Sequence, residues 1–110
     1  MSTDMPPSSP PSRLEQIQAM LVRSPGDPFL LYALAQEQAK AGNHAQAVLA
    51  YDRCLAADPT YYYAYYHKAR SQEELGDAAG LIATLDAGIA ASRGKDAKAH
   101  AELLAYRDMV

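Results

Sequence analysis

The sequence repeats itself at a spacing of 34 residues, and this period restricts the fold more than any other feature. A shift of 34 aligns Tyr32 with Tyr66, Ala35 with Ala69, Gln38 with Gln72, Gly42 with Gly76 and Asp52 with Asp86. A backward shift aligns Leu14 with Val48 and Leu21 with Leu55, so the N-terminal segment matches the second half of each later unit. A period of this length indicates stacked supersecondary units, each of which buries its apolar face only against its neighbours.

Composition indicates that these units are helical. Alanine accounts for 22 of the 110 residues, whereas valine and isoleucine together account for six. A sheet is excluded because β-branched residues usually cover its faces. The length corresponds to one small domain. The sequence therefore predicts one all-α domain built from antiparallel helical hairpins.

Helix start and stop signals divide the chain at regular intervals. Asp27 before Pro28 is an N-cap signal, and Gly42 is suited to end a helix with positive φ. Asn43, Thr60, Asp77 and Asp96 are predicted to cap the following helices, Asn43 with Gln46 in a capping box. The predicted divisions are a disordered Pro/Ser-rich tail (1–12), a half-repeat helix (13–24), a first repeat (27–60), a second repeat (61–94) and a capping helix (96–110).

Charge and reactive residues exclude several classes of function. The formal net charge of -3 argues against a nucleic-acid partner. Cys54 is the single cysteine, so neither an internal disulfide nor a cysteine zinc site is possible, and it is predicted to be a small buried residue. The three histidines share no metal-ligand spacing and no glycine-rich phosphate loop is present, so we expect no enzyme, no metal and no cofactor. Without a signal peptide or an apolar run of membrane-spanning length, we expect a cytoplasmic protein.

A known family shares this pattern. The 34-residue unit with Leu31, Leu34, Ala35, Gly42, Ala47, Tyr51 and Pro59 resembles the tetratricopeptide repeat, or TPR. The resemblance covers about residues 13–110 as two and a half repeats, and the second repeat retains Tyr65, Ala69 and Gly76. It implies a short right-handed solenoid of stacked hairpins with a concave groove. Such proteins are mostly scaffolds for protein–protein interaction.

The resemblance also implies which residues face a partner, because the first helix of each repeat lines the groove in this family. The corresponding candidates are Phe29, Tyr32 and Gln36 in the first repeat, and Tyr63, Tyr66, His67, Arg70 and Glu73 in the second. Their spacing places the members of each set on one helix face. Some TPR proteins bind a C-terminal carboxylate through lysine and asparagine, but Tyr32 and Gln36 occupy those places here. We therefore expect a groove lined by aromatic residues, with Arg70 as its main cation, that binds a peptide or partner segment.

Five of the eight tyrosines lie between Tyr61 and Tyr66, and a run of this kind surrounds a helix. We expect Tyr61, Tyr62 and Tyr65 to pack between hairpins and Tyr63 and Tyr66 to reach the groove. Tyrosine supplies contact area at low entropic cost, which suits a binding surface.

Two alternative functions stay open at this point. Tyr63, Tyr66, His67, Lys68 and Arg70 combine stacking rings with positive charge, as in single-strand RNA binding, although the acidic balance opposes it. The stronger rival is a structural subunit that forms a homodimer through its terminal helices. The N-terminal helix offers the apolar residues Leu14, Ile17, Met20, Leu21 and Val22, and the last helix offers Leu103, Leu104 and Tyr106. Helical repeats need caps at both ends, and an imperfect cap exposes apolar surface to a second copy.

Overall fold

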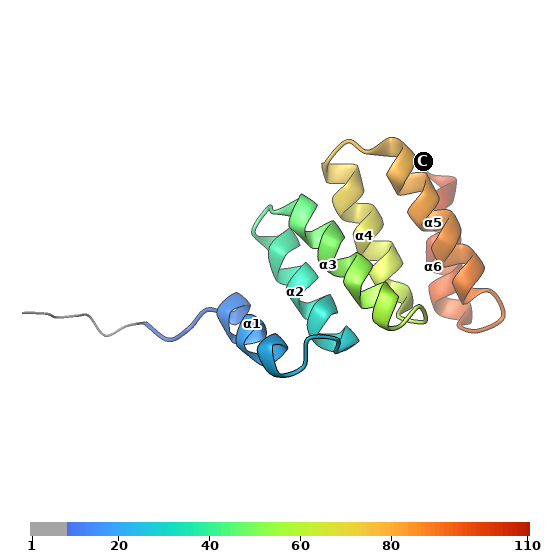
Figure 1. The fold of residues 1–110 in the computed structure, drawn as a ribbon. Coiled ribbons are helices and arrows are strands. Elements are labelled where there is room, and N and C mark those ends of the chain that lie inside the picture. The colour runs from blue at the N-terminus through green and yellow to red at the C-terminus, as the bar shows by residue number, and fades with distance from the viewer. Residues whose placement is uncertain (1–8) are drawn as a thin grey trace, which may run out of the picture.

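The computed structural model describes residues 9–110, and helices are the regular elements within them. The helices are α1 (Arg13–Arg23), α2 (Pro28–Lys40), α3 (His44–Ala57), α4 (Tyr62–Glu74), α5 (Ala78–Ser92) and α6 (Ala97–Asp108). Helices α2 to α5 stand side by side in chain order with alternating directions, and α6 lies behind α5 (Figure 1). The predicted all-α class is confirmed.

Two helical hairpins form the centre of the molecule. The most extensive contacts join α2 to α3 and α4 to α5, and α3 packs on α4 to stack one hairpin on the next. The outer helices pack on this pair: α1 on α2, and α6 on α5 with further contacts to α4. The predicted solenoid of stacked antiparallel hairpins is therefore the observed architecture.

Small residues allow the helices to approach closely. Ala35, Ala47 and Ala69 are completely buried, as is Cys54. Burial raises the pKa of the Cys54 thiol to about 11, so at neutral pH it is a packing group rather than a nucleophile. Larger side chains fill the space that remains, with Tyr51 at 1% exposure as the largest of the fully buried ones. The predicted role of Cys54 as a small buried residue is confirmed.

Aspartate caps and positive-φ glycines set several helix ends, as predicted. The Asp27 carboxylate accepts hydrogen bonds from the backbone N–H groups of Phe29 and Leu30, and Asp77 and Asp96 cap α5 and α6 in the same way. Gly42 closes α2 with φ of 84°. A side chain with Cβ is strained in this left-handed conformation, so glycine is favoured where the hairpin reverses.

One of the predicted caps is wrong, and another lacks its side-chain bond. Asn43 is the N-cap residue of α3, but its side chain makes no cap bond and the predicted capping box is absent; its amide Nδ2 donates to Gln38 Oε1 at 3.0 Å. The Thr60 hydroxyl donates to Asp58 Oδ1 at 2.6 Å, so Tyr61 is the N-cap of α4 without a side-chain bond. In both cases the side chain bonds to a preceding polar residue in the turn, a local competition that turn-forming residues favour.

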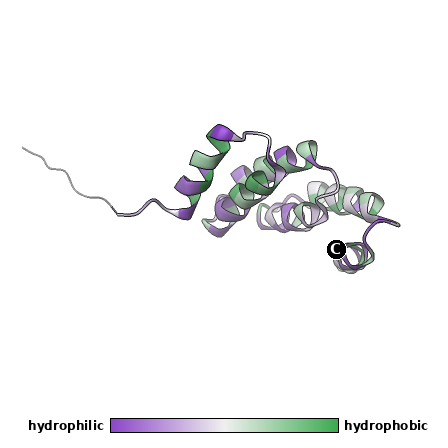
Figure 2. Ribbon diagram, turned by 90° about the horizontal axis from the view of Figure 1, so that it is seen from below, coloured by the Kyte–Doolittle hydropathy of each residue, from purple (hydrophilic) through white to green (hydrophobic). Residues whose placement is uncertain are grey.

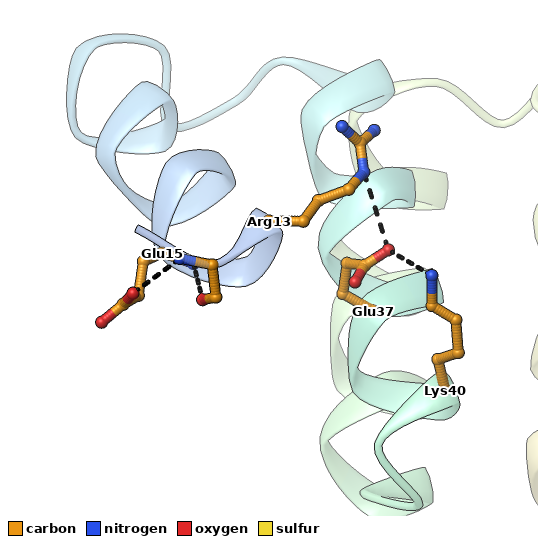
Figure 3. Close-up of polar contacts among 5 residues, drawn as sticks. Arg13, Glu15, Glu37 and Lys40 are labelled. Carbon is orange, nitrogen blue, oxygen red and sulfur yellow. Dashed lines mark hydrogen bonds and ion pairs between the residues drawn. The ribbon is translucent and has the colours of Figure 1, made fainter. Parts of the chain in front are cut away.

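Helix α1 is fixed to α2 by apolar and ionic contacts. Ile17 and Leu21 are buried, and hydrophilic and hydrophobic residues alternate along the helix (Figure 2). Ser12 forms a capping box with Glu15, and Arg13 Nε lies 3.6 Å from Glu37 Oε2 on α2 (Figure 3). The helix is therefore a packed part of the stack.

The predicted disordered tail lies outside the described residues for positions 1–8. Ser9, Pro10, Pro11 and Ser12 are exposed and precede α1 without regular structure. Across residues 9–110, no helix combines the length and the apolar character that a membrane crossing requires.

Candidate functional site

A cavity of about 480 Å³ lies between α2, α3 and α4 and is called here the α2–α4 cavity. Its lining is mostly polar: Gln36, Glu37, Ala39, Lys40, His44, Tyr51, His67, Arg70, Ser71 and Glu74. The stacking of one hairpin on the next brings these residues together from three helices. The cavity can therefore offer hydrogen-bond donors, acceptors and both signs of charge to a ligand.

Hydrogen bonds fix two of the side chains that line this cavity, Gln36 and Tyr51. The Tyr51 hydroxyl donates to Gln36 Oε1 at 2.7 Å, and Gln36 Nε2 donates to the Tyr32 hydroxyl at 3.1 Å. Burial raises the pKa of Tyr32 to about 12, and burial also raises the pKa of Tyr51. Both phenols stay protonated at neutral pH, so Tyr51 is available as a donor and Gln36 is held in one orientation.

His67 lies in the wall of the same cavity, among aromatic rings. Its ring centroid lies 5.4 Å from that of Tyr66, 5.9 Å from that of Tyr32 and 6.5 Å from that of Tyr51. Burial lowers the pKa of His67, and the positive charge of Arg70 lowers it further. At neutral pH the imidazole is therefore uncharged, and Arg70 remains the cation beside it.

The lowered pKa of His67 predicts a loss of stability in mild acid. The native state binds fewer protons than the unfolded chain, so this contribution is fully present above the unfolded pKa near 6.5 and declines as pH falls through it. We expect the urea midpoint to fall between pH 7.5 and pH 5.5, and to fall less in His67→Gln. Equal pH dependence in the two proteins, measured by circular dichroism, would contradict this assignment.

A second cavity of about 340 Å³ lies between α4 and α6 and is called here the α4–α6 cavity. Tyr66, Arg70, Glu73, Tyr106, Met109 and Val110 line it. The Tyr66 and Tyr106 rings meet edge to face with centroids 5.2 Å apart, and the Tyr106 hydroxyl donates to Glu73 Oε1. This cavity is more apolar than its neighbour, and Arg70 lines both.

The structure places five of the predicted site residues on the two cavities. Gln36 and His67 line the α2–α4 cavity, Tyr66 and Glu73 line the α4–α6 cavity, and Arg70 joins them. The remaining three lie elsewhere on the same helices. Phe29 is 59% exposed in the first turn of α2, Tyr63 is 37% exposed and bonds through its hydroxyl to Glu102 of α6 at 3.2 Å, and Tyr32 is half-buried against Tyr61.

The three tyrosines expected to pack between hairpins are half-buried. The Tyr61 ring lies 4.8 Å from that of Tyr32, and the Tyr65 hydroxyl donates to the carbonyl of Pro59 at 3.0 Å. Tyr61 therefore packs between the two hairpins, whereas Tyr65 packs within the second hairpin, against Gly88 of α5.

Sequence reasoning missed the contribution of α6 to the cavity walls. Tyr106, Met109 and Val110 belong to a segment that the sequence predicts only as a terminal cap. One further shift of 34 residues aligns Gln72 with Tyr106 and Ala69 with Leu103. That alignment places α6 in phase with α2 and α4, which both contribute residues to the α2–α4 cavity. In residues 9–110 no group of three or more histidine, cysteine, aspartate or glutamate side chains is placed to hold a metal ion.

Comparison with known proteins identifies the family. No family model and no curated protein matches the chain. A crystal structure of a tetratricopeptide repeat domain protein from Salinibacter ruber is 34% identical, covering 74% of this chain and 91% of its own, with a TM-score of 0.66. Its solution NMR structure, also 34% identical, covers 76% and 85% with a TM-score of 0.69. This chain belongs to the tetratricopeptide repeat family.

Two more distant structures show the same TPR fold. PcrH, in a crystal structure with the chaperone binding region of PopD, is 19% identical and covers 87% of this chain and 74% of its own, with a TM-score of 0.81. A protein from Bordetella parapertussis, solved in solution, is 24% identical and covers 90% and 87%, with a TM-score of 0.77. At these identities the likeness concerns the fold alone.

Proposed function

We propose that this TPR protein is a non-catalytic interaction module that binds an extended segment of another protein. The binding surface is the groove formed by the α2–α4 and α4–α6 cavities, which are joined at Arg70. The shared lining residue Arg70 is the observation that carries the proposal, because it makes the two cavities neighbours and an extended chain needs adjacent contact sites. The related fold of PcrH, which holds a region of PopD, supports a protein segment as the ligand.

The groove suits a reversible interaction. Fifteen residues line the two cavities, fewer than the roughly 20–30 that each partner contributes to a standard protein–protein interface, so affinity depends on a few contacts. The Tyr51–Gln36–Tyr32 hydrogen bonds hold the lining residues Gln36 and Tyr51 in place before binding, which limits the side-chain entropy lost when a ligand binds. We expect dissociation constants in the micromolar range for single segments.

Selection from a library of linear peptides, followed by fluorescence anisotropy with the selected peptides, tests this function. Glu74 is exposed and lines the α2–α4 cavity, whereas its neighbour Leu75 is also exposed but lines neither cavity. Glu74→Trp should weaken binding at least about fivefold by narrowing the cavity, and Leu75→Trp should leave it unchanged. The proposal would be contradicted if the selected peptides bound Glu74→Trp as tightly as the wild-type protein, or if the selection yielded no binder.

A second candidate function is self-association through the terminal helices. Met20 is 45% and Val22 82% exposed on α1, and Leu104 is 45% exposed on α6, so each end of the stack presents apolar surface. Light scattering discriminates between the two candidates: a dimer whose molar mass is independent of concentration supports self-association, and a monomer counts against it.

A further inference from the structure

Arg70 occupies a special position in the groove. Its side chain is exposed and lines both cavities, and its charge acts on groups in each of them. It lowers the pKa of His67 on one side and opposes the upward pKa shift of Tyr106 on the other. The guanidinium therefore stands at the junction, where the middle of a bound segment would pass.

None of the ion pairs formed within residues 9–110 includes Arg70. The pairs are Arg13–Glu37, Lys40–Glu37, Lys68–Asp52 and Arg107–Asp86. Arg70 takes part in none of these pairs, although Glu73 and Glu74 follow it on the same helix. A guanidinium presents five donors in a planar fork that matches a carboxylate, so this group is free to receive one from a ligand.

The nearby acidic groups are largely occupied by other partners. Glu37 is contacted by both Arg13 at 3.6 Å and Lys40 at 3.3 Å (Figure 3), so its charge is offset from two sides. Glu73 accepts the hydrogen bond from the Tyr106 hydroxyl. Glu74 remains as an exposed carboxylate at the rim of the α2–α4 cavity. Of the two cations that line the cavities, Lys40 is paired with Glu37, so Arg70 is the one that an acidic side chain of a ligand would meet.

The two cavities differ in what they can accept on either side of Arg70. Met109 is 77% and Val110 43% exposed beside the Tyr66 and Tyr106 rings, so the α4–α6 cavity presents apolar surface. The α2–α4 cavity presents the hydroxyl, amide and imidazole groups described above. Side chains on one face of an extended chain recur at every second residue, about 6.4–6.8 Å apart. A segment that crosses the groove can thus place one residue at Arg70 and the next on that face in a cavity.

We propose that the groove recognises an internal, extended segment in which an acidic side chain pairs with Arg70 and an aliphatic or aromatic side chain two residues away enters the α4–α6 cavity. The inference rests on the proposed function and specifies its partner. The segment is internal because a cavity lies on each side of Arg70, so the bound chain continues past the carboxylate in both directions. The acidic group is therefore a side chain and not the terminus of the partner.

Three peptides with blocked ends test this specificity. They share one sequence from the peptide selection and carry glutamate, glutamine or lysine at the position assigned to Arg70. Wild-type protein should bind the glutamate peptide about tenfold more tightly than the glutamine peptide, because an ionised acceptor strengthens the hydrogen bonds with Arg70. It should bind the lysine peptide most weakly of the three. Arg70→Glu should reverse the order. Arg53→Glu, on an exposed site of α3 away from both cavities, should preserve it.

The outcomes separate this inference from the proposed function. Equal binding of the glutamate and glutamine peptides, or an unchanged order in Arg70→Glu, overturns the inference while groove binding stands. Selected peptides without an acidic residue overturn it in the same way. A gain of tenfold or more on freeing the C-terminus would assign Arg70 to a terminal carboxylate instead. If no peptide binds the wild-type protein, both the proposed peptide binding and the proposed role of Arg70 are wrong.

Discussion

Replacing Tyr51 by alanine is expected to lower the free energy of unfolding by about 4 kcal/mol, within the range measured for large aromatic truncations in protein cores. Tyr51 is 1% exposed, and its ring packs edge to face on Tyr32 with centroids 6.0 Å apart. Alanine would leave a void between the first hairpin and α4, and it would remove the donor to Gln36. Urea denaturation followed by circular dichroism measures the loss.

A matched substitution on the same helix provides the control. Leu49 is 62% exposed, so Leu49→Ala should change the free energy of unfolding by less than about 0.5 kcal/mol. Tyr51→Phe separates the hydroxyl from the ring, and it should cost about 1 kcal/mol because one hydrogen bond to Gln36 is lost. Similar midpoints for Tyr51→Ala and Leu49→Ala would show that Tyr51 is not a core residue.

Replacing Gly88 by valine is expected to cause the second large loss of stability, because the packing around Gly88 leaves no room for a side chain. A Cβ atom at this position would lie 2.7 Å from Tyr65 Cβ and 3.1 Å from Leu103 Cδ1. Gly88→Val should therefore push α5 away from α4 and α6 and cost about 3 kcal/mol, as overpacking of a dense core does. The same urea experiment detects the change as a lower midpoint.

The neighbouring position distinguishes crowding from the effect of valine on helix formation. Ala87 is exposed on the same helix, so Ala87→Val should cost only the propensity difference, roughly 0.5–0.7 kcal/mol. Gly88→Ala should fall between the two valine variants. A Gly88→Val protein as stable as Ala87→Val would mean that α5 can shift without loss, contrary to the close packing described above.

Sequence reasoning was most successful where a local signal has one physical meaning. The 34-residue period, the aspartate caps and Gly42 each report on a short segment, and each corresponds to the observed structure. Thr60 is not the N-cap of α4, and Asn43 is the N-cap of α3 without a side-chain cap bond. Both side chains bond to nearby polar side chains, and the sequence does not show which bond is stronger. Competition between alternatives of similar energy is resolved only when the neighbouring turn is fixed.

The sequence could predict the candidate site only in part, because it indicates which residues share a helix face but not which other helix packs beside that face. Helix periodicity grouped Gln36, Arg70 and Glu73 with the other candidates because spacing along a helix determines a shared face, and these three line the cavities. It could not show that Phe29 and Tyr63 lie beyond the cavities, or that Tyr106 completes one of them. Those facts depend on where the next helix packs, which no single helix specifies.

The sequence by itself determined the all-α class, the repeat length, the family and the order of the helices, since periodicity and end signals act within about 34 residues. The tertiary structure alone decided how α6 closes the second cavity and how Arg70 comes to stand between two cavities. The physical reason is that these features arise from contacts between residues that are distant in sequence, such as Tyr66 with Tyr106. Packing of whole helices sets those contacts, and local propensity does not contain that information.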